Sequence, residues 1–196
     1  MIYQLSHFIK DKFPFVWRVV EFLNSLLFYL FYRRKLSSID KVLECYQQEY
    51  IVRLASLNDV DALVLFFEKQ PIEAFRFFNP HSFDAKTISR LIKSKAYLFF
   101  VVLKEKQIVG YFFLRCFFNG KCFRGKIVDY RWRNRGIAKL MGKVSTDVAV
   151  HLGLRIFGTI SKDNVASMAS SSAVNEIKII EYLPNDFVYI EYLPKK

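Results

Sequence analysis

The residues best placed to do chemistry lie in the stretch Arg133-Asn134-Arg135-Gly136-Ile137-Ala138. An apolar run ending at residues 127–129 precedes this stretch, and the helical pattern of residues 139–144 follows it. A turn at a helix start leaves backbone N–H groups unpaired, and the helix dipole there also favours negative charge. Gly136 lets the backbone approach an anion closely, and Ala138 keeps a bulky side chain out of the way. The stretch therefore predicts a socket for phosphate or pyrophosphate.

Positive charge and regular elements surround the predicted socket. Arg131 precedes it, and Arg133 and Arg135 lie within it. Runs of apolar, aromatic and β-branched residues predict strands, and Asn119-Gly120 is a strong signal for a hairpin between two of them. The predicted strands cover residues 97–103, 108–115, 121–129, 154–160, 177–183 and 187–193. A second helix is expected to start near Asn164, which is a good capping residue.

The turn and the order of these elements resemble the GNAT acyltransferase superfamily. Arg133, Gly136 and Ala138 match its acyl-CoA-binding pattern, usually written Gln/Arg-x-x-Gly-x-Gly/Ala. Upstream, residues 51–55 and the helix start at residues 58–61 are similar to the opening elements of that family. A six-residue pattern is weak by itself, and the element order is what gives it weight.

The resemblance implies the class of fold and the organisation of the chain. It covers residues 50–194 and implies an α/β (α+β) fold with a central mixed, mostly antiparallel sheet flanked by helices. The acetyltransferase domain is assigned to residues 50–196, and residues 1–49 form an N-terminal helical extension. The hydrophobic content of 53% excludes a disordered chain.

The same resemblance implies transfer of an acetyl group from acetyl-CoA to a primary amine by direct attack in a ternary complex. Backbone N–H groups near Ile127 and Val128 would polarise the thioester carbonyl, in a strand that typically carries a bulge and splays from its neighbour. The turn would bind the coenzyme A phosphates, while Asn164 and Ser167 match positions that contact pantetheine or coenzyme A. The implied cofactor-binding residues are Ile127, Val128, Arg133, Asn134, Arg135, Gly136, Ile137, Ala138, Asn164 and Ser167.

The chain departs from the family at the general acid. Relatives often have a Tyr seven residues after the Asn that leads the late helix, and this chain has Ser171 there. A serine, a water molecule or nothing takes the place of the usual acid. A catalytically weakened scaffold that binds acyl-CoA at a membrane surface is therefore a second hypothesis, from a different class.

Two residues are candidates for the general base. His81 lies in an aromatic loop, residues 78–84, in a region that borders the acceptor pocket in the family, and its ordinary pKa suits proton transfer from an ammonium group. Asp129 stands at the end of the strand before the phosphate turn, which faces the reaction centre in the family. A purely structural role remains open for both.

Charge and cysteine content limit the partners. Thirty Lys and Arg against 18 Asp and Glu give a net charge of +12, which suits an anionic membrane surface, coenzyme A phosphates or a generally basic surface. No nucleic-acid motif accompanies this charge, so no nucleic-acid partner is expected. Cys45, Cys116 and Cys122 have no metal-binding spacing, so no metal is expected, and reduced cytosolic thiols are favoured over a disulfide.

The first 50 residues differ from a plain GNAT domain. A helix is predicted over residues 15–32, with Pro14 in its first turn and Arg33-Arg34-Lys35 after it. Its polar residues, Arg18, Glu21, Ser25 and Tyr32, form one narrow stripe. The two charges near one end disfavour a spanning helix and a secretory signal. Residues 13–35 could contact a membrane surface, pack on the core or pair with a second subunit, and a further helix is predicted over residues 36–50.

The acceptor is the least defined part of the prediction. The aromatic loop that contains His81 resembles that of bacterial enzymes that acetylate amino sugars for surface polysaccharide. A small amine or a protein N-terminus remains open. The expected location is the cytoplasm, including a peripheral position at the inner membrane surface.

Overall fold

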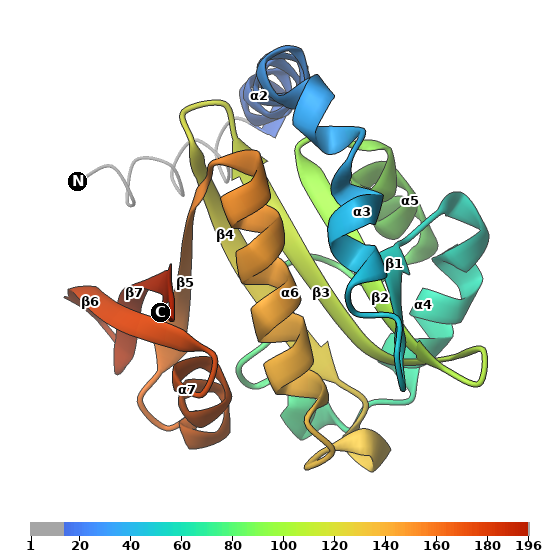
Figure 1. Ribbon diagram of the computed structural model, residues 1–196, viewed down its shortest axis with the longest axis vertical. Coiled ribbons are helices and arrows are strands. Elements are labelled where there is room, and N and C mark those ends of the chain that lie inside the picture. The colour runs from blue at the N-terminus through green and yellow to red at the C-terminus, as the bar shows by residue number, and fades with distance from the viewer. Residues whose placement is uncertain (1–13, 196) are drawn as a thin grey trace.

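A seven-stranded sheet with the order β1-β2-β3-β4-β5-β7-β6 is the framework of the molecule (Figure 1). The computed structural model describes residues 14–195. The strands are β1 (Ile51–Leu54), β2 (Tyr97–Lys104), β3 (Gln107–Phe117), β4 (Lys121–Val128), β5 (Arg155–Ser161), β6 (Asn175–Leu183) and β7 (Phe187–Pro194). The α-helices are α2 (Pro14–Leu36), α3 (Ile39–Glu44), α4 (Val60–Glu68), α5 (Ala85–Lys93), α6 (Ile137–Leu152) and α7 (Val165–Ser172). Short 3-10 helices are η1 (Leu57–Asp59), η2 (Ile72–Phe75) and η3 (Tyr130–Trp132).

The sheet is mixed, as the sequence predicted. Neighbouring strands run antiparallel except β4 and β5, which run parallel. β4 and β5 are paired only at residues 121–123 and 155–157, and then they diverge (Figure 1). β4 keeps one register with β3 along its whole length. The bulge that the resemblance implied in β4 is therefore absent from this pairing, and the strands diverge without it.

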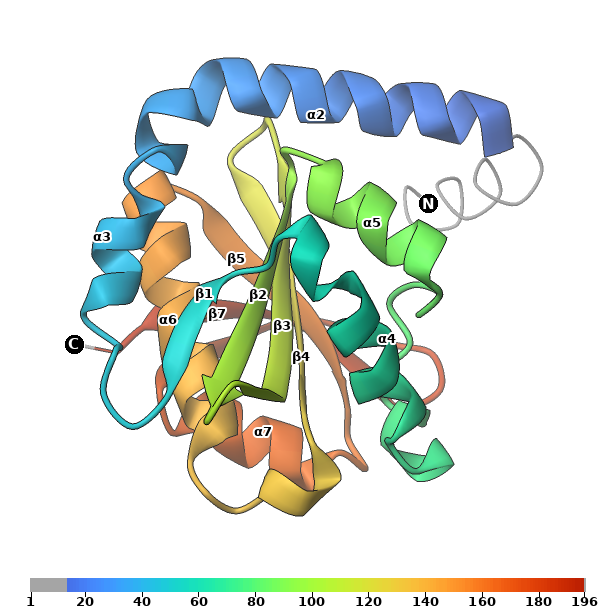
Figure 2. The ribbon, with the colours of Figure 1, turned by 90° about the vertical axis from the view of Figure 1, so that its right-hand side faces the viewer.

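Two layers of helices cover the two faces of the sheet. Helices α4 and α5 pack on one face, and α3 and α6 pack on the other (Figure 2). β2 is an almost continuous apolar run because both of its faces are covered. Its residue Phe99 joins the core under α4 and α5, and the next residue, Phe100, joins the core under α6.

The N-terminal helices belong to the same body. Phe28 of α2 and Ile39 and Leu43 of α3 lie in the core under α6. The predicted helix over residues 36–50 was too long, because α3 ends at Glu44. Gln47 closes the turn that follows: its Nε2 donates to the carbonyl oxygens of Leu43 and Val52, at 3.1 and 2.6 Å.

Candidate functional site

The turn between β4 and α6 is built to present backbone N–H groups. η3 follows β4, and α6 begins at Ile137 directly after Gly136. Asn134 and Gly136 both have left-handed backbones, with φ of 61° and 79°. Within residues 14–195, the N–H groups of residues 134–138 have no hydrogen-bond acceptor. Alternating backbone hands that turn successive N–H groups to one side form a concave nest for anions.

Space and charge at this turn also fit an anion. A Cβ added to Gly136 would meet no atom within 4 Å, so the approach is open. Arg133 and Arg135 are exposed and form no ion pair within the described chain. The guanidinium carbon of Arg135 lies 4.7 Å from the centre of the Trp132 ring, and this stacking holds the guanidinium beside the turn. Of the predicted residues, 133–136 are exposed at the turn, whereas the side chain of Ile137 is buried in the core and only its backbone N–H can serve the site.

Asp129 stands at the start of this turn, between β4 and η3. Its carboxylate is 1% exposed and accepts hydrogen bonds from the backbone N–H, the Nε and the Nη2 of Arg131, at 2.9, 3.1 and 2.8 Å. Burial raises the pKa of Asp129, but the hydrogen bonds from Arg131 outweigh burial and leave it below the ordinary value. A carboxylate occupied in this way is a poor proton acceptor near neutral pH.

β4 leads into the turn with an unpaired edge on the side of β5. The N–H of Asp129 donates to Val109 of β3 at 3.0 Å. Hydrogen-bonded residues alternate along an antiparallel pair. The N–H of Ile127 therefore points to β3, and the N–H groups of Lys126 and Val128 point to the side where β5 diverges. Of the two predicted residues, Val128 is the one whose N–H faces this side.

His81 lies on the opposite face of the sheet from α6, in a cage of aromatic rings. Its Nδ1 lies 2.8 Å from the carbonyl oxygen of Ser82, which makes Nδ1 the protonated nitrogen. Its Nε2 lies 3.0 Å from the hydroxyl of Tyr111. The surrounding rings belong to Phe67, Phe83, Tyr97, Phe99, Tyr111 and Phe113. Burial lowers the pKa of His81, so the ring is neutral near pH 7.

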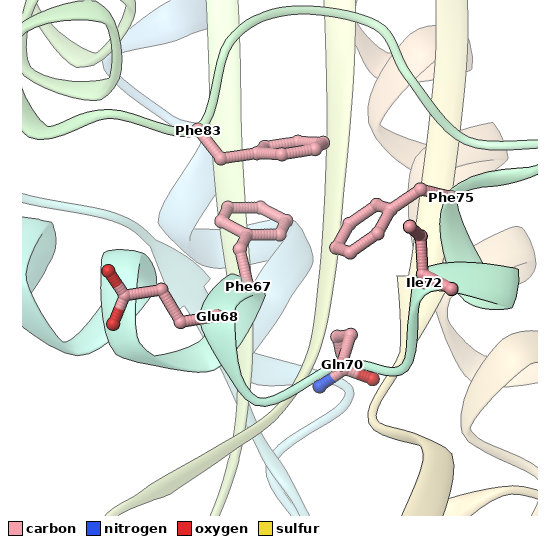
Figure 3. Close-up of a pocket in the computed structure, with 6 residues that line it drawn as sticks. All are labelled: Phe67, Glu68, Gln70, Ile72, Phe75 and Phe83. Atoms are coloured by element: carbon pink, nitrogen blue, oxygen red, sulfur yellow. The ribbon is translucent and has the colours of Figure 1, made fainter.

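A hollow of about 290 Å³ opens beside this cage (Figure 3). The rings of Phe67 and Phe83 are stacked with centroids 4.2 Å apart, and Phe75 lies 5.0 Å from Phe83. The lining is completed by Glu68, Gln70 and Ile72. Gln70 also connects the hollow to the turn, because its Oε1 accepts a hydrogen bond from the N–H of Tyr130 at 3.0 Å. The lining is mostly apolar, with an exposed carboxylate at Glu68.

α7 brings the remaining predicted residues to the α6 side of the sheet. Asn164 caps the helix, since its Oδ1 accepts a hydrogen bond from the N–H of Ser167 at 3.1 Å. Ser171 is 0% exposed, and its Oγ lies 3.5 Å from Nη2 of Arg124. Ser171 is therefore on the other side of the sheet from His81, and it faces the interior.

Two cations on β4, the buried Arg124 and the half-buried Lys126, were missed by the sequence reasoning. The guanidinium carbon of Arg124 lies 3.4 Å from the centre of the Tyr192 ring. Its Nη1 donates to the carbonyl oxygen of Gly142 and to Asn175 Oδ1, at 3.1 and 3.2 Å. Lys126 donates from Nζ to the carbonyl oxygen of Ala138 and to Ser170 Oγ, at 2.9 and 3.0 Å. Neither cation forms an ion pair in the described chain. Burial lowers the pKa of Arg124, and burial together with the charge of Arg124 lowers the pKa of Lys126 to about 7.

The signal for these two cations was present in the sequence. Arg124 and Lys126 alternate along β4 with positions that face α4 and α5, so they share a face with the buried Cys122. A charged residue at successive inward positions of a strand violates the usual pattern and indicates a special role.

Comparison with known proteins identifies the fold. Searches found no matching family model and no matching sequence among curated proteins. Solved structures do match: the PaiA N-acetyltransferase of Thermoplasma acidophilum in complex with coenzyme A has a TM-score of 0.63 at 12% identity, over 76% of this chain and 100% of that one. The ribosomal-protein-S5-alanine acetyltransferase of Vibrio fischeri has a TM-score of 0.60 at 19% identity, over 75% and 93%. RimJ of Mycobacterium smegmatis in complex with CoA-disulfide has a TM-score of 0.60 at 15% identity, over 74% and 81%.

The chain has the fold of the GNAT acetyltransferases, and the sequence prediction of this fold is confirmed.

Proposed function

We propose that the protein is an N-acetyltransferase that moves an acetyl group from acetyl-CoA to a primary amine. The turn before α6 carries this proposal, because five consecutive free N–H groups and two unpaired arginines make an anion site at the end of a diverging strand pair. Residues 133–138 would hold the phosphates, and the free edge of β4 at Val128 would hold the pantetheine arm. Asn164 Nδ2 and Ser167 at the start of α7 would contact the same arm from the other side.

The acceptor amine is assigned to the hollow beside His81. Phe75 and Phe83 offer ring faces to a cationic or sugar-bearing amine, and Glu68 offers a negative charge at the rim. His81 would be the general base: its neutral Nε2 lies 3.0 Å from the Tyr111 hydroxyl, and the ammonium proton would reach it through that hydroxyl or through water. Asp129 is assigned to holding the turn. An amino sugar of surface polysaccharide synthesis remains our candidate acceptor, with the aromatic lining as its support.

The chemistry follows from these placements. Acetyl-CoA supplies the acyl group as a thioester. His81 takes one proton from the ammonium group, and the amine then attacks the carbonyl carbon while the N–H of Val128 stabilises the negative charge on the oxygen. The bond between carbon and sulfur breaks, and the product nitrogen releases its second proton.

The departing thiolate needs a proton donor, and Lys126 is the residue that we assign. It lies on the diverging part of β4, next to Ser170, one position before the serine that stands where relatives have their acid. Its ammonium group would give a proton to sulfur and regain the proton that the product nitrogen releases. Ser171 is buried against Arg124, which favours Lys126 over it.

We assign this catalytic unit to residues 50–196 and treat residues 1–49 as an addition to it. The three structures described above each match about three quarters of this chain, which is the length of residues 50–196. A reducing cytoplasm is the proposed location, because Cys116 and Cys122 are register partners on β3 and β4 and both thiols are free.

Calorimetric titration of acetyl-CoA tests the phosphate turn. Gly136→Glu should weaken affinity more than about tenfold, because a carboxylate would repel the phosphates. Gly120→Glu is the matched control: Gly120 also has a left-handed backbone, with φ of 81°, and lies in the β3–β4 turn. The control should bind as the wild type does.

Turnover with a panel of amines separates an enzyme from the scaffold. The enzyme releases thiol only when an amine is present, whereas the scaffold binds acetyl-CoA without amine-dependent release. Absence of acetyl-CoA binding by the wild type would contradict both.

A further inference from the structure

α2 is an amphipathic helix that turns its polar side toward the protein. Asn24 donates from Nδ2 to the carbonyl oxygen of Cys116 at 2.9 Å and accepts from the N–H of Phe118 at 3.2 Å. Ser25 accepts from the N–H of Lys95 at 3.1 Å, and Glu21 pairs with Arg115 at 3.2 Å. Three of these contacts are side-chain hydrogen bonds to the backbone, so the helix is fixed in rotation as well as in position.

The opposite side of α2 is apolar and uncovered within the described chain. We call it the outward face, and Figure 2 shows α2 lying across one end of the molecule. Its exposed large side chains are Phe15, Val16, Val19, Val20, Phe22, Leu23, Leu26, Tyr29, Leu30 and Phe31. Phe118, on the adjacent β3–β4 turn, is also exposed and extends this surface. A soluble helix normally buries its apolar side, and a patch of this kind marks an interaction site.

The charges on α2 indicate that a partner bound to the outward face carries negative charge. Arg18, Arg33 and Arg34 are exposed and form no ion pair within residues 14–195. The single acidic residue of α2, Glu21, is paired with Arg115 of β3. The outward face therefore combines apolar side chains with uncompensated positive charge at both ends of the helix.

We propose that the outward face of α2 lies in the headgroup region of an anionic lipid bilayer, with the helix parallel to the membrane. Apolar side chains that enter the boundary between headgroups and acyl chains, together with arginines that reach anionic headgroups, describe an interfacial helix. A second copy of the chain fits less well. An isologous helix pair would bring arginines together with no carboxylate on either outward face to meet them.

The same contacts argue against a spanning helix. In the described residues, the segment Phe15–Leu36 is long and apolar enough to cross a membrane by length and composition. Spanning would require this segment to leave the domain. Glu21, Asn24, Ser25 and the fully buried Phe28 bind it to the domain across the middle of its length. An interfacial position keeps all of these contacts.

Vesicle co-sedimentation of the full chain tests the proposal. Wild-type protein should bind vesicles that contain phosphatidylglycerol, bind phosphatidylcholine vesicles much less, and lose binding as salt increases. Phe22→Glu combined with Leu30→Glu should lower partitioning at least about tenfold. Arg33→Gln combined with Arg34→Gln should lower it roughly fivefold for each cation removed.

Tyr182→Glu is the matched control. Tyr182 on β6 is 66% exposed, as is Phe22, so the control adds one of the two charges of the double variant at a position away from α2 and should bind vesicles as the wild type does. Acetyl-CoA affinity should be the same in all variants, which keeps this test separate from that of the proposed function. Wild type that ignores anionic vesicles, equal binding by the Phe22 and Leu30 double variant, or a lipid-free dimer that this variant dissociates would each overturn the proposal.

Discussion

At the scale of single residues, His81 is a histidine that the fold keeps uncharged. Ser82 accepts its Nδ1 proton and the Tyr111 hydroxyl faces its Nε2, so the basic nitrogen stays in an aromatic cage. This cage opens next to the hollow in which we place the acceptor. Its partly buried position disfavours the protonated ring and lowers its pKa, so the base form predominates at neutral pH.

The rate of acetyl transfer should depend on pH in a way that reports His81. Because burial lowers the pKa of His81, the acidic limb of the kcat/KM profile, where the ring becomes protonated, should lie below the ordinary value of 6.5. His81→Gln should lower kcat/KM about a hundredfold or more and remove this acidic limb. His151→Gln, on α6, should leave the profile intact. An acidic limb that persists in His81→Gln would assign the base elsewhere.

Lys126 should destabilise the fold at neutral and lower pH. Its pKa is about 7 in the folded chain and 10.5 ordinarily, so the unfolded chain binds the extra proton between these values and the free energy of unfolding rises with pH there. Lys126→Met should raise the free energy of unfolding by about 1–4 kcal/mol at pH 7 and below, and the gain should shrink towards pH 10. Denaturant titration over this pH range measures the difference.

The same variant tests the assignment of Lys126 as the proton donor. Lys126→Met should slow turnover while leaving acetyl-CoA affinity unchanged, and it should remove an alkaline limb near pH 7. Lys178→Met, an exposed lysine on β6, is the control for loss of a positive charge. A more stable variant with full turnover would leave Lys126 a structural residue.

Residue types indicated part of the site in advance. Gly136 and Asn164 were predictable because a left-handed turn and a helix cap each favour particular residues, and both lie where the sequence placed them. The environment of Lys126 was not predictable, because a strand pattern tells which residues share a face but not which neighbours cover it. The partner of His81 Nε2, Tyr111, comes from a strand thirty positions away in the sequence.

At the scale of elements, the turn between β4 and α6 depends on Asp129. Its carboxylate binds Arg131, and its carbonyl oxygen accepts from the N–H of Trp132 at 2.8 Å. These contacts form η3 and set the direction in which the chain enters the nest. Asp129 therefore affects the site through backbone geometry.

Asp129→Asn should weaken acetyl-CoA binding without changing the acidic limb of the pH profile. Loss of the charged hydrogen bonds to Arg131 should cost about 1.5–3 kcal/mol of stability and loosen the turn. Calorimetry and a pH profile on the same preparation measure both effects. Asp61→Asn, on α4, provides the control for loss of a carboxylate. A lost acidic limb in Asp129→Asn would restore this residue as the candidate base.

The elements themselves followed closely from local patterns. The Asn119-Gly120 hairpin formed as predicted, with Gly120 at a left-handed φ. The orientation of α2 did not follow, although the polar stripe was visible. Periodicity shows that a helix has two sides, and the usual assumption is that the apolar side faces the core. Here hydrogen bonds from Asn24 and Ser25 to distant backbone groups decided the orientation.

At the scale of the whole molecule, β4 connects two surfaces with different partners. Its first residues follow the turn that contacts α2, and its last residue precedes the phosphate turn. The mixed, mostly antiparallel sheet with flanking helices was predictable from the resemblance to the GNAT family, which rests on the phosphate turn and the order of the elements along the chain. The relation of α2 to that sheet was out of reach, since residues of α2 contact strands more than ninety positions away.

The position of α2 at one end of β4 sets the distance between the proposed membrane surface and the phosphate turn. β4 has eight residues, and at about 3.3 Å per residue it holds the phosphate turn about 25 Å from the helix. With α2 in the headgroup region, the phosphate turn would lie above the headgroups. Nucleotide-linked substrates and lipids with long polar headgroups would reach that height. Amines that lie within the bilayer surface itself would pass beneath the reaction centre.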